Sequence, residues 1–227
     1  MRRVFAVIAA LVLLFPSGAL GAVSFDNDKD CGSTNPCSYT SSGSNGFIEA
    51  VLGISTGGTT ITVDGAPMMI AYSQTVTGAG TGIDAYIFTS AGTHSISVSG
   101  TDNGMAISSW NGVGSVDATS TGSLSCSTLS QSITPVASNT WATWMISNGD
   151  NGPTAISNVT MRISSNGSAV GIGDSNGTIP AGMSYTMQAN CNGTAGAGRG
   201  QGTILTLAPV GGAPVAPIFW GTSAWWW

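Results

Sequence analysis

The sequence predicts an all-β protein, a single antiparallel β-sandwich of about eleven short strands. Three observations lead to this expectation. Short runs rich in Ile, Val, Thr and aromatic residues recur along the chain, clusters of Gly, Asn, Asp and Ser separate them, and no segment sustains a helical period. A chain of 227 residues with 33 glycines fits one domain of roughly 160–180 residues behind a leader.

Residues 1–22 have the composition of a secretory signal peptide. Two arginines follow Met1, the apolar run Val4–Phe15 comes next, and a Pro/Gly segment ends in small residues. The competing interpretation, a membrane anchor, needs roughly 20 apolar residues, which this run does not reach. Cleavage after Gly21 or Ala22 leaves three basic and ten acidic residues, a net charge of −7. The mature chain is expected to be secreted or at a cell surface, with no later membrane span.

Residues 23–46 are polar, rich in Gly and Ser, and are expected to form a loop segment. The alternating carboxylates Asp26, Asp28 and Asp30 are the kind of oxygen ligands that a calcium loop needs. The EF-hand spacing, however, places Cys37 where the bidentate Glu should stand. A solvated N-terminal segment without a metal is the preferred interpretation.

The sandwich itself is expected over residues 47–208. Its candidate strands are Phe47–Ile54, Thr59–Val63, Met68–Tyr72, Ile83–Phe88, His94–Ser99, Met105–Trp110, Leu129–Ile133, Thr140–Ser147, Ala155–Ile163, Ser184–Ala189 and Gly202–Leu207. The pair Asp64-Gly65 is a strong hairpin signal, because both residues tolerate positive φ. Asp102-Asn103-Gly104 and Asp150-Asn151-Gly152 predict further turns by the same chemistry.

The four cysteines allow three disulfide connectivities. Proximity in the sequence favours Cys31–Cys37, which leaves Cys126–Cys191 as a bond between distant segments. A zinc site is disfavoured, because the chain has no CxxC spacing and a single histidine, so all four thiolates would be required. Two disulfides in an oxidising compartment are expected, with no metal and no cofactor.

The charge of the chain excludes several classes of protein. Five basic residues cannot form the basic stripe of a nucleic-acid-binding protein. Disorder driven by charge is excluded because 42% of the residues are hydrophobic, and a helical bundle because the chain has one Glu and one Lys. Ser and Thr are expected on the solvent faces of the strands. Edge strands without Lys or Pro are expected to be covered or to pair with another chain.

Six segments of the chain follow one another in an order typical of one kind of domain. They are Thr60–Met68, Ala85–Phe88, Ala91–Ser99, Met105–Val113, Thr140–Ser147 and Ala181–Met187. This order resembles the jelly-roll-type β-sandwich domains of secreted bacterial surface proteins and tailed-phage structural proteins. The resemblance covers residues 45–208 and implies a jelly-roll fold and a surface or virion location. Because it rests on turn glycines and core strands, it implies no catalytic residue.

Two residues are candidates for acid–base chemistry. His94, the sole histidine, alternates in phase with Ile96 and Val98, which favours a partly buried histidine over a general base. Glu49, the sole glutamate, lies in an apolar strand without a partner that suggests a glycosidase pair. No GxSxG elbow supports a Ser–His–Asp triad. A non-catalytic protein is expected, and a secreted hydrolase with an unrecognised site is the alternative.

Three tryptophans, Trp110, Trp141 and Trp144, are candidate ligand-binding residues. Trp141 and Trp144 are three positions apart, so on a strand they face opposite sides, and an exposed ring would stack on a sugar. Burial of both is the preferred interpretation, because tryptophan is highly buried on average. Four Asn-X-Ser/Thr triplets, three of them Asn-Gly pairs typical of turns, begin at Asn158, Asn166, Asn176 and Asn192.

Residues 209–227 consist of a Pro/Gly linker and a Trp-rich tail. The tail is an apolar decamer that contains the docking candidates Phe219, Trp220, Trp225, Trp226 and Trp227. Tryptophan favours membrane interfaces and protein–protein hot spots. Three interpretations stay open: a segment that docks on a partner or a neighbouring copy, the beginning of a longer anchor, and a segment that folds back on the sandwich.

These features predict an exported, non-catalytic structural or binding module of a cell surface or virion. A protein partner or self-association is expected, nucleic acid is not, and the tail is a candidate for interfacial contact with a membrane. A carbohydrate-binding or adhesive protein is the first alternative.

Overall fold

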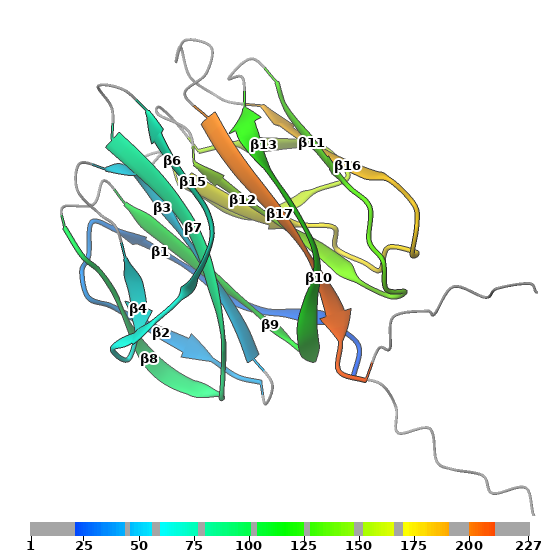
Figure 1. Ribbon diagram of the computed structural model, residues 1–227. Coiled ribbons are helices and arrows are strands. Elements are labelled where there is room, and N and C mark those ends of the chain that lie inside the picture. The colour runs from blue at the N-terminus through cyan, green and yellow to red at the C-terminus, as the bar shows by residue number, and fades with distance from the viewer. Residues whose placement is uncertain are drawn as a thin grey trace, which may run out of the picture.

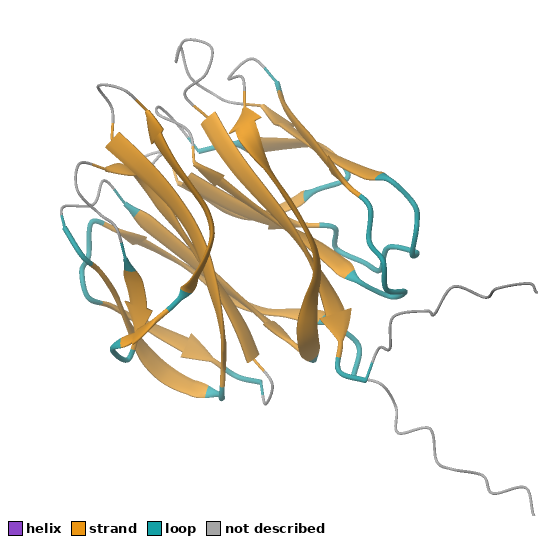
Figure 2. Cartoon of the chain, viewed as in Figure 1, coloured by secondary structure: helices purple, strands orange, loops and turns teal. Residues whose placement is uncertain are grey.

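The computed structural model describes residues 21–43, 46–55, 60–76, 80–100, 104–124, 128–147, 152–165, 170–190 and 200–211. All regular elements of this part of the chain are β-strands, and their pairing is antiparallel (Figure 2). The expectation of an all-β fold is thus confirmed. No helix of the described residues is long and apolar enough to cross a membrane.

The first half of the chain forms two sheets. The inner one has the spatial order β1 (Ser24–Gly32), β9 (Met105–Asn111), β3 (Gly46–Ser55), β7 (Gly80–Thr89) and β6 (Met69–Val76). The outer one has the order β2 (Cys37–Ser41), β8 (Gly92–Val98), β4 (Ile61–Val63) and β5 (Ala66–Pro67). We call this pair of sheets the N-terminal sandwich.

The second half forms two further sheets, which we call the C-terminal sandwich. The inner sheet has the order β10 (Val113–Leu124), β17 (Gly200–Pro209), β12 (Trp141–Ser147), β15 (Val170–Asp174) and β14 (Thr160–Ser165). The outer sheet has the order β11 (Leu129–Ile133), β16 (Tyr185–Asn190) and β13 (Thr154–Ser157). The two inner sheets lie against each other in the middle of the molecule (Figure 1).

Three hydrophobic cores fill the spaces between the four layers. The first packs residues of β2, β4 and β8 on residues of β3, β7 and β9, among them Tyr39 and Ile107. The second lies between the inner sheets and includes Phe47 and Leu205. The third packs β12 and β17 on the outer C-terminal sheet. The expectation of one two-layered sandwich was therefore wrong, because the chain folds into two that share a central core.

The two sandwiches have the same topology. When β1 is matched with β10, β2 with β11 and so on to β9 with β17, the inner orders become identical. The outer orders then match as well, with β2-β8-β4 corresponding to β11-β16-β13. Strand β5 has no counterpart among the described residues. The chain thus contains an internal structural repeat.

Irregularities of pairing fall at matching positions and fix the residue equivalences. The β6–β7 ladder skips Ala71, and the β14–β15 ladder skips Arg162. The β1–β9 ladder skips Asp26, and the β10–β17 ladder skips Asp117. The residue pairs across each inner sheet connect one bulge to the other. Both bulges therefore define the same residue equivalences between the two sandwiches.

The bulge aspartates confirm this equivalence by their hydrogen bonds. Asp26 accepts bonds from the N–H and hydroxyl groups of Ser42 and, at 2.7 Å, from Ser109 Oγ. Asp117 accepts bonds from the N–H groups of Val136 and Ala137 at 2.7 and 3.0 Å, and from Thr206 Oγ1, the residue equivalent to Ser109. Each bulge therefore ties the edge strand to the loop after the next strand.

The segment 23–46, expected to be a loop, contains β1 and β2 and belongs to the N-terminal sandwich. Its polar residues are compatible with strands because β1 is an edge strand with most side chains partly or fully exposed. Strand β10 was missed for the same reason. Strand β15 was missed because two of its five residues are glycines, whose missing side chains make room for Pro153, Val159 and Met161.

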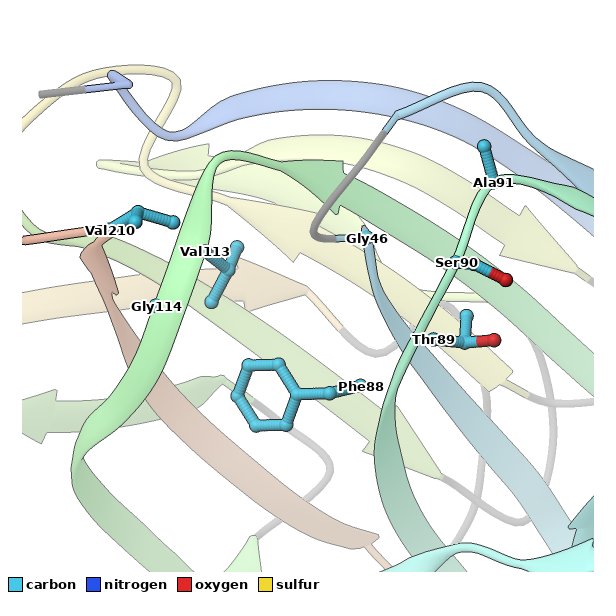
Figure 3. A pocket seen from close by; sticks show the side chains of 8 residues that line it. All are labelled: Gly46, Phe88, Thr89, Ser90, Ala91, Val113, Gly114 and Val210. Atoms are coloured by element: carbon cyan, nitrogen blue, oxygen red, sulfur yellow. The ribbon is translucent and has the colours of Figure 1, made fainter. Parts of the chain in front are cut away.

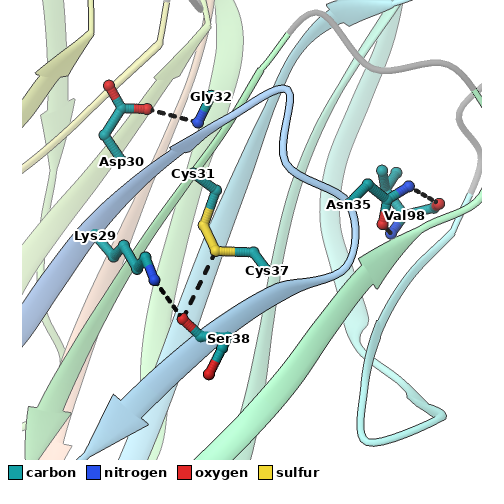
Figure 4. The surroundings of a disulfide bond; sticks show 8 residues. All are labelled: Lys29, Asp30, Cys31, Gly32, Asn35, Cys37, Ser38 and Val98. Carbon is teal, nitrogen blue, oxygen red and sulfur yellow. Dashed lines mark hydrogen bonds between the residues drawn. A yellow bond between two sulfur atoms is a disulfide. The ribbon is translucent and has the colours of Figure 1, made fainter.

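Two local expectations are confirmed. Cys31 and Cys37 form a disulfide that joins β1 and β2 at the end of the outer sheet (Figure 4). Asp64 and Gly65, with φ of 51° and 83°, form the turn between β4 and β5. The expected Cys126–Cys191 bond lies outside the described residues.

Candidate functional site

The interface between the inner sheets has pseudo-twofold symmetry. Glu49 of β3 and Thr143 of β12 are equivalent residues. Glu49 pairs with Tyr86, and Thr143 pairs with Asp174. On their other side, Tyr86 and Asp174 pair with Met69 and Thr160, each two positions before the bulge residue of its strand. These two residues contact each other, and Thr143 Oγ1 donates a hydrogen bond to Glu49 Oε1. A residue that contacts its own equivalent lies on the symmetry axis. The sandwiches therefore pack as two subunits of an isologous dimer do.

Buried carboxyl groups surround this axis. Burial, followed by the charges of Asp84 and Asp174, raises the pKa of Glu49 to about 8, although the Thr143 hydrogen bond opposes the shift. Burial also raises the pKa of Asp84 to about 7, against hydrogen bonds from Thr203 and Gln201. Glu49 and Asp84 are fully buried. In this environment both carboxyls favour the neutral form.

Asp174 is the buried acid of the interface that has a cationic partner. Arg162 donates from Nε and Nη2 to its two oxygens, at 2.8 and 3.1 Å, and Trp110 Nε1 approaches it at 3.4 Å. The guanidinium also lies over the ring of Phe25, 4.1 Å from the centroid, and donates to Asn176. Arg162 thus closes one of the two symmetry-related rims of the interface, between β1 and β14.

An open groove of about 860 Å³ lies between the two sandwiches. It is lined by Gly46, Phe88, Thr89, Ser90, Ala91, Val113, Gly114 and Val210. Its lining comes from both sandwiches, at the end of β7 and at the β10 and β17 ends that meet there (Figure 3). Phe88 and Val210 are 42% and 38% exposed. None of the lining residues carries a charge.

The groove shares one residue with the part of the interface that is equivalent to the Arg162 rim. Arg162 is equivalent to Ala71, and Asp174 to Tyr86. Asn176, which Arg162 reaches, is equivalent to Phe88, which lines the groove. Ala71 packs on the central core and does not line the groove, and it cannot supply the cation that Arg162 supplies to Asn176. The floor of the groove is aromatic: Phe88 contacts Phe47 and Tyr86 at centroid distances of 5.2 and 6.4 Å.

Behind one wall of the groove, His94 lies between a serine and a carboxylate. Its Nδ1 is 2.8 Å from Asp64 Oδ2, and its Nε2 is 3.0 Å from the carbonyl of Ser90 and 3.4 Å from Ser41 Oγ. Hydrogen bonds from His94 and Ser95 lower the pKa of Asp64. Both ring nitrogens therefore lie within hydrogen-bond distance of an acceptor oxygen.

This geometry does not leave His94 free to act as a base. A general base for Ser41 needs an unprotonated Nε2, whereas the Ser90 carbonyl at 3.0 Å requires a proton there. Ser41 and His94 are also 2% and 6% exposed. The expectation of a partly buried, hydrogen-bonded histidine is confirmed. Glu49, buried on the symmetry axis, faces Thr143 and contacts no groove residue by hydrogen bond.

Trp141 and Trp144 lie on opposite faces of β12, as the alternation of side chains along a strand predicts. Trp141 packs on the central core and Trp144 in the core of the C-terminal sandwich. Trp110 and Trp144 are completely buried, so neither offers a ring face to a sugar, and the Trp144 Nε1 donates to Gln131 at 2.8 Å. Trp141 alone of these three is partly exposed.

The three aspartates proposed as calcium ligands have other partners. Asp26 accepts hydrogen bonds from the hydroxyl groups of Ser42 and Ser109. Asp28 interacts with the positive charge of Arg162, and Asp30 accepts a hydrogen bond from the N–H of Gly32. No group of three or more His, Cys, Asp or Glu side chains within the described ranges is arranged to hold a metal ion. Of the Asn-X-Ser/Thr sites, Asn158 and Asn176 are turn residues with positive φ. The tail residues 212–227 lie outside the described part of the chain.

The groove and the Arg162 rim were not foreseen from the sequence. The repeat on which their comparison depends is visible in the strand order of the sheets. No protein-family model, curated protein or solved structure matches the chain.

Proposed function

We propose that the chain is an exported, non-catalytic structural or binding module of a cell surface or virion, and that it binds an apolar segment of a protein in the groove. Each sandwich pairs its first strand with its last and has two Greek-key sheets, which supports the assignment of both as jelly rolls. The signal-peptide pattern and the Cys31–Cys37 disulfide support export.

The observation that carries the proposal is the contrast between the two rims of the interface. On one rim, Arg162, Asp174 and Phe25 satisfy one another. On the other, Ala71 stands in place of Arg162, and an uncharged groove lies beside the partly exposed Phe88. An apolar groove rimmed by the small polar residues Thr89 and Ser90 is typical of a protein-binding site.

Binding of 8-anilinonaphthalene-1-sulfonate, a dye that becomes fluorescent in apolar sites, tests the groove. Trp225→Ser, Trp226→Ser and Trp227→Ser are combined in the tested chain, so that the Trp-rich tail does not compete with the dye. We expect this chain to enhance the fluorescence and its Phe88→Ser derivative to lose most of the enhancement. Its Met183→Ser derivative is the matched control, because Met183 is 59% exposed and lies outside the groove. Equal enhancement by all three chains would contradict the proposal. Secretion is tested separately by N-terminal sequencing of the exported chain, with Ala22 or Val23 expected first.

A further inference from the structure

We propose that the groove receives the apolar segment Ile218–Trp227 of a second copy of this chain, in a reciprocal dimer. The inference rests on the proposed function and names the partner that the groove binds. Val210 forms part of the groove wall, and its N–H donates to the carbonyl of Gly112 at 2.9 Å. The chain therefore leaves the described structure at the edge of the groove.

The chemistry of the segment matches that of the groove. No charged residue occurs between Gly200 and Trp227, and the last ten residues include four tryptophans and Phe219. The groove lining is uncharged as well, and it includes the ring of Phe88, which is 42% exposed. Aromatic side chains bury 150–250 Å² each and prefer edge-to-face or offset contact with other rings, so one or two indole rings suit an open apolar groove of this size.

The linker favours a second copy over the chain's own groove. Its residues Ala213–Pro217 contain two prolines, for which the sequence predicts a stiff extended segment of about 16 Å, at roughly 3.1 Å per residue. This stiff part begins after Gly211 and Gly212, so it places Ile218 about 16 Å from Ala213 and cannot fold back on the groove wall at Val210 within its own length. The aromatic residues are then placed for a neighbouring molecule.

The positions of tail and groove predict the symmetry of the assembly. Val210 lines the groove and the described chain ends one residue later, at Gly211, so the groove and the start of the tail lie at the same end of the molecule. Two copies that meet at this end can each insert a tail into the other's groove. Such an exchange is closed and two-fold, whereas a tail and groove at opposite ends would produce an open chain.

Sedimentation equilibrium of the mature full-length chain tests the proposal. We expect a dimer for the wild type, and at least a ten-fold weaker association for Phe88→Asp and for the triple variant Trp225→Ser, Trp226→Ser, Trp227→Ser. Met183→Asp, the matched control, should stay dimeric. A monomeric wild type, or a triple variant that associates like the wild type, would overturn the proposal.

Two further measurements separate the alternatives. A fluorescent peptide of residues 213–227 should bind the triple variant, whose groove is free, and bind its Phe88→Asp derivative at least ten-fold more weakly. If the dye binds in a Phe88-dependent way but the peptide does not bind, the proposed function stands and this inference fails. If neither binds, both fail. Co-sedimentation of the wild type with phosphatidylcholine vesicles, lost in the triple variant while the dimer persists, would assign the tail to a membrane and overturn the inference.

Discussion

Replacing Glu49 with glutamine should make the stability of the protein less dependent on pH. Glu49 is fully buried on the pseudo-twofold axis, and its pKa of about 8 in the folded chain compares with 4.5 for the ordinary group. Between these two pH values the folded state keeps a proton that the unfolded state has released. Linkage then requires the free energy of unfolding to fall as pH rises through this window.

The magnitude follows from the two pKa values. For one group that titrates at 4.5 unfolded and about 8 folded, the loss between pH 5 and pH 8 is about 3 kcal/mol. Asp84, with a pKa of about 7, adds to the loss in the same direction. The glutamine side chain has the shape of the protonated carboxyl, and its amide oxygen still accepts a hydrogen bond from the Thr143 hydroxyl. Glu49→Gln should therefore be within about 1 kcal/mol of the wild type at pH 5 and more stable than it at pH 8.

Equilibrium unfolding in urea at pH 5, 6, 7 and 8, with the disulfides intact, measures this effect. The buried Trp110 and Trp144 provide a fluorescence signal for loss of the central and C-terminal cores. Asp30→Asn, at an exposed carboxyl of β1, is the control and should follow the wild type. An unchanged pH dependence in Glu49→Gln, or a wild type that gains stability from pH 5 to pH 8, would refute the reasoning.

Four other substitutions, one of them a control, test the packing, the ion pair at the interface and the adhesive alternative. Gly112→Ala should lower the free energy of unfolding by about 1–3 kcal/mol, because Gly112 has a φ of 72° and an added Cβ would lie 2.6 Å from a backbone carbonyl oxygen. Gly122→Ala is the control, since Gly122 has open space around it, and it should change the free energy of unfolding by no more than about 0.5 kcal/mol. Arg162→Ala leaves the buried Asp174 without its cation and should cost about 3–5 kcal/mol in urea unfolding; a cost below about 1 kcal/mol would contradict this role. In polysaccharide pull-downs neither the wild type nor Trp141→Ala should be retained, and retention that Trp141→Ala abolishes would favour the adhesive alternative.

The strands with alternating or apolar sequences could be predicted, and the layers could not. The expected runs at Phe47–Ile54, Met105–Trp110 and Leu129–Ile133 coincide closely with β3, β9 and β11. Alternation shows which strands cover one face of a core, as in β11, whose residues are alternately buried and exposed. Strands β9, β12 and β17 are buried on almost every residue, a pattern compatible with the middle of any stack. The number of layers is therefore set by tertiary packing that no local pattern records.

The site residues were missed because their roles depend on pairing between distant segments. His94 was placed on the correct face by its phase with Ile96 and Val98. Its partners Asp64 and Ser41, at 30 and 53 positions away, were not singled out, because a turn aspartate and a strand serine are common. The two rims differ because Ala71 stands at the bulge position where the other sandwich has Arg162. That contrast becomes visible only after the two halves are aligned.

The repeat explains why a binding site would arise at this place. In a symmetric dimer of identical sandwiches, both rims of the interface would carry the same residues and would be filled or open together. Joining the two units in one chain removes that constraint, because each rim can then change independently. Here one rim carries a buried ion pair, whose geometry holds β1 against β14. The other has Ala71 in place of Arg162, and Glu49, Thr143 and the central core hold the sheets together without a second ion pair of this kind. The fold therefore tolerates an opening beside the second rim, and we propose that this opening accepts an apolar side chain of another molecule.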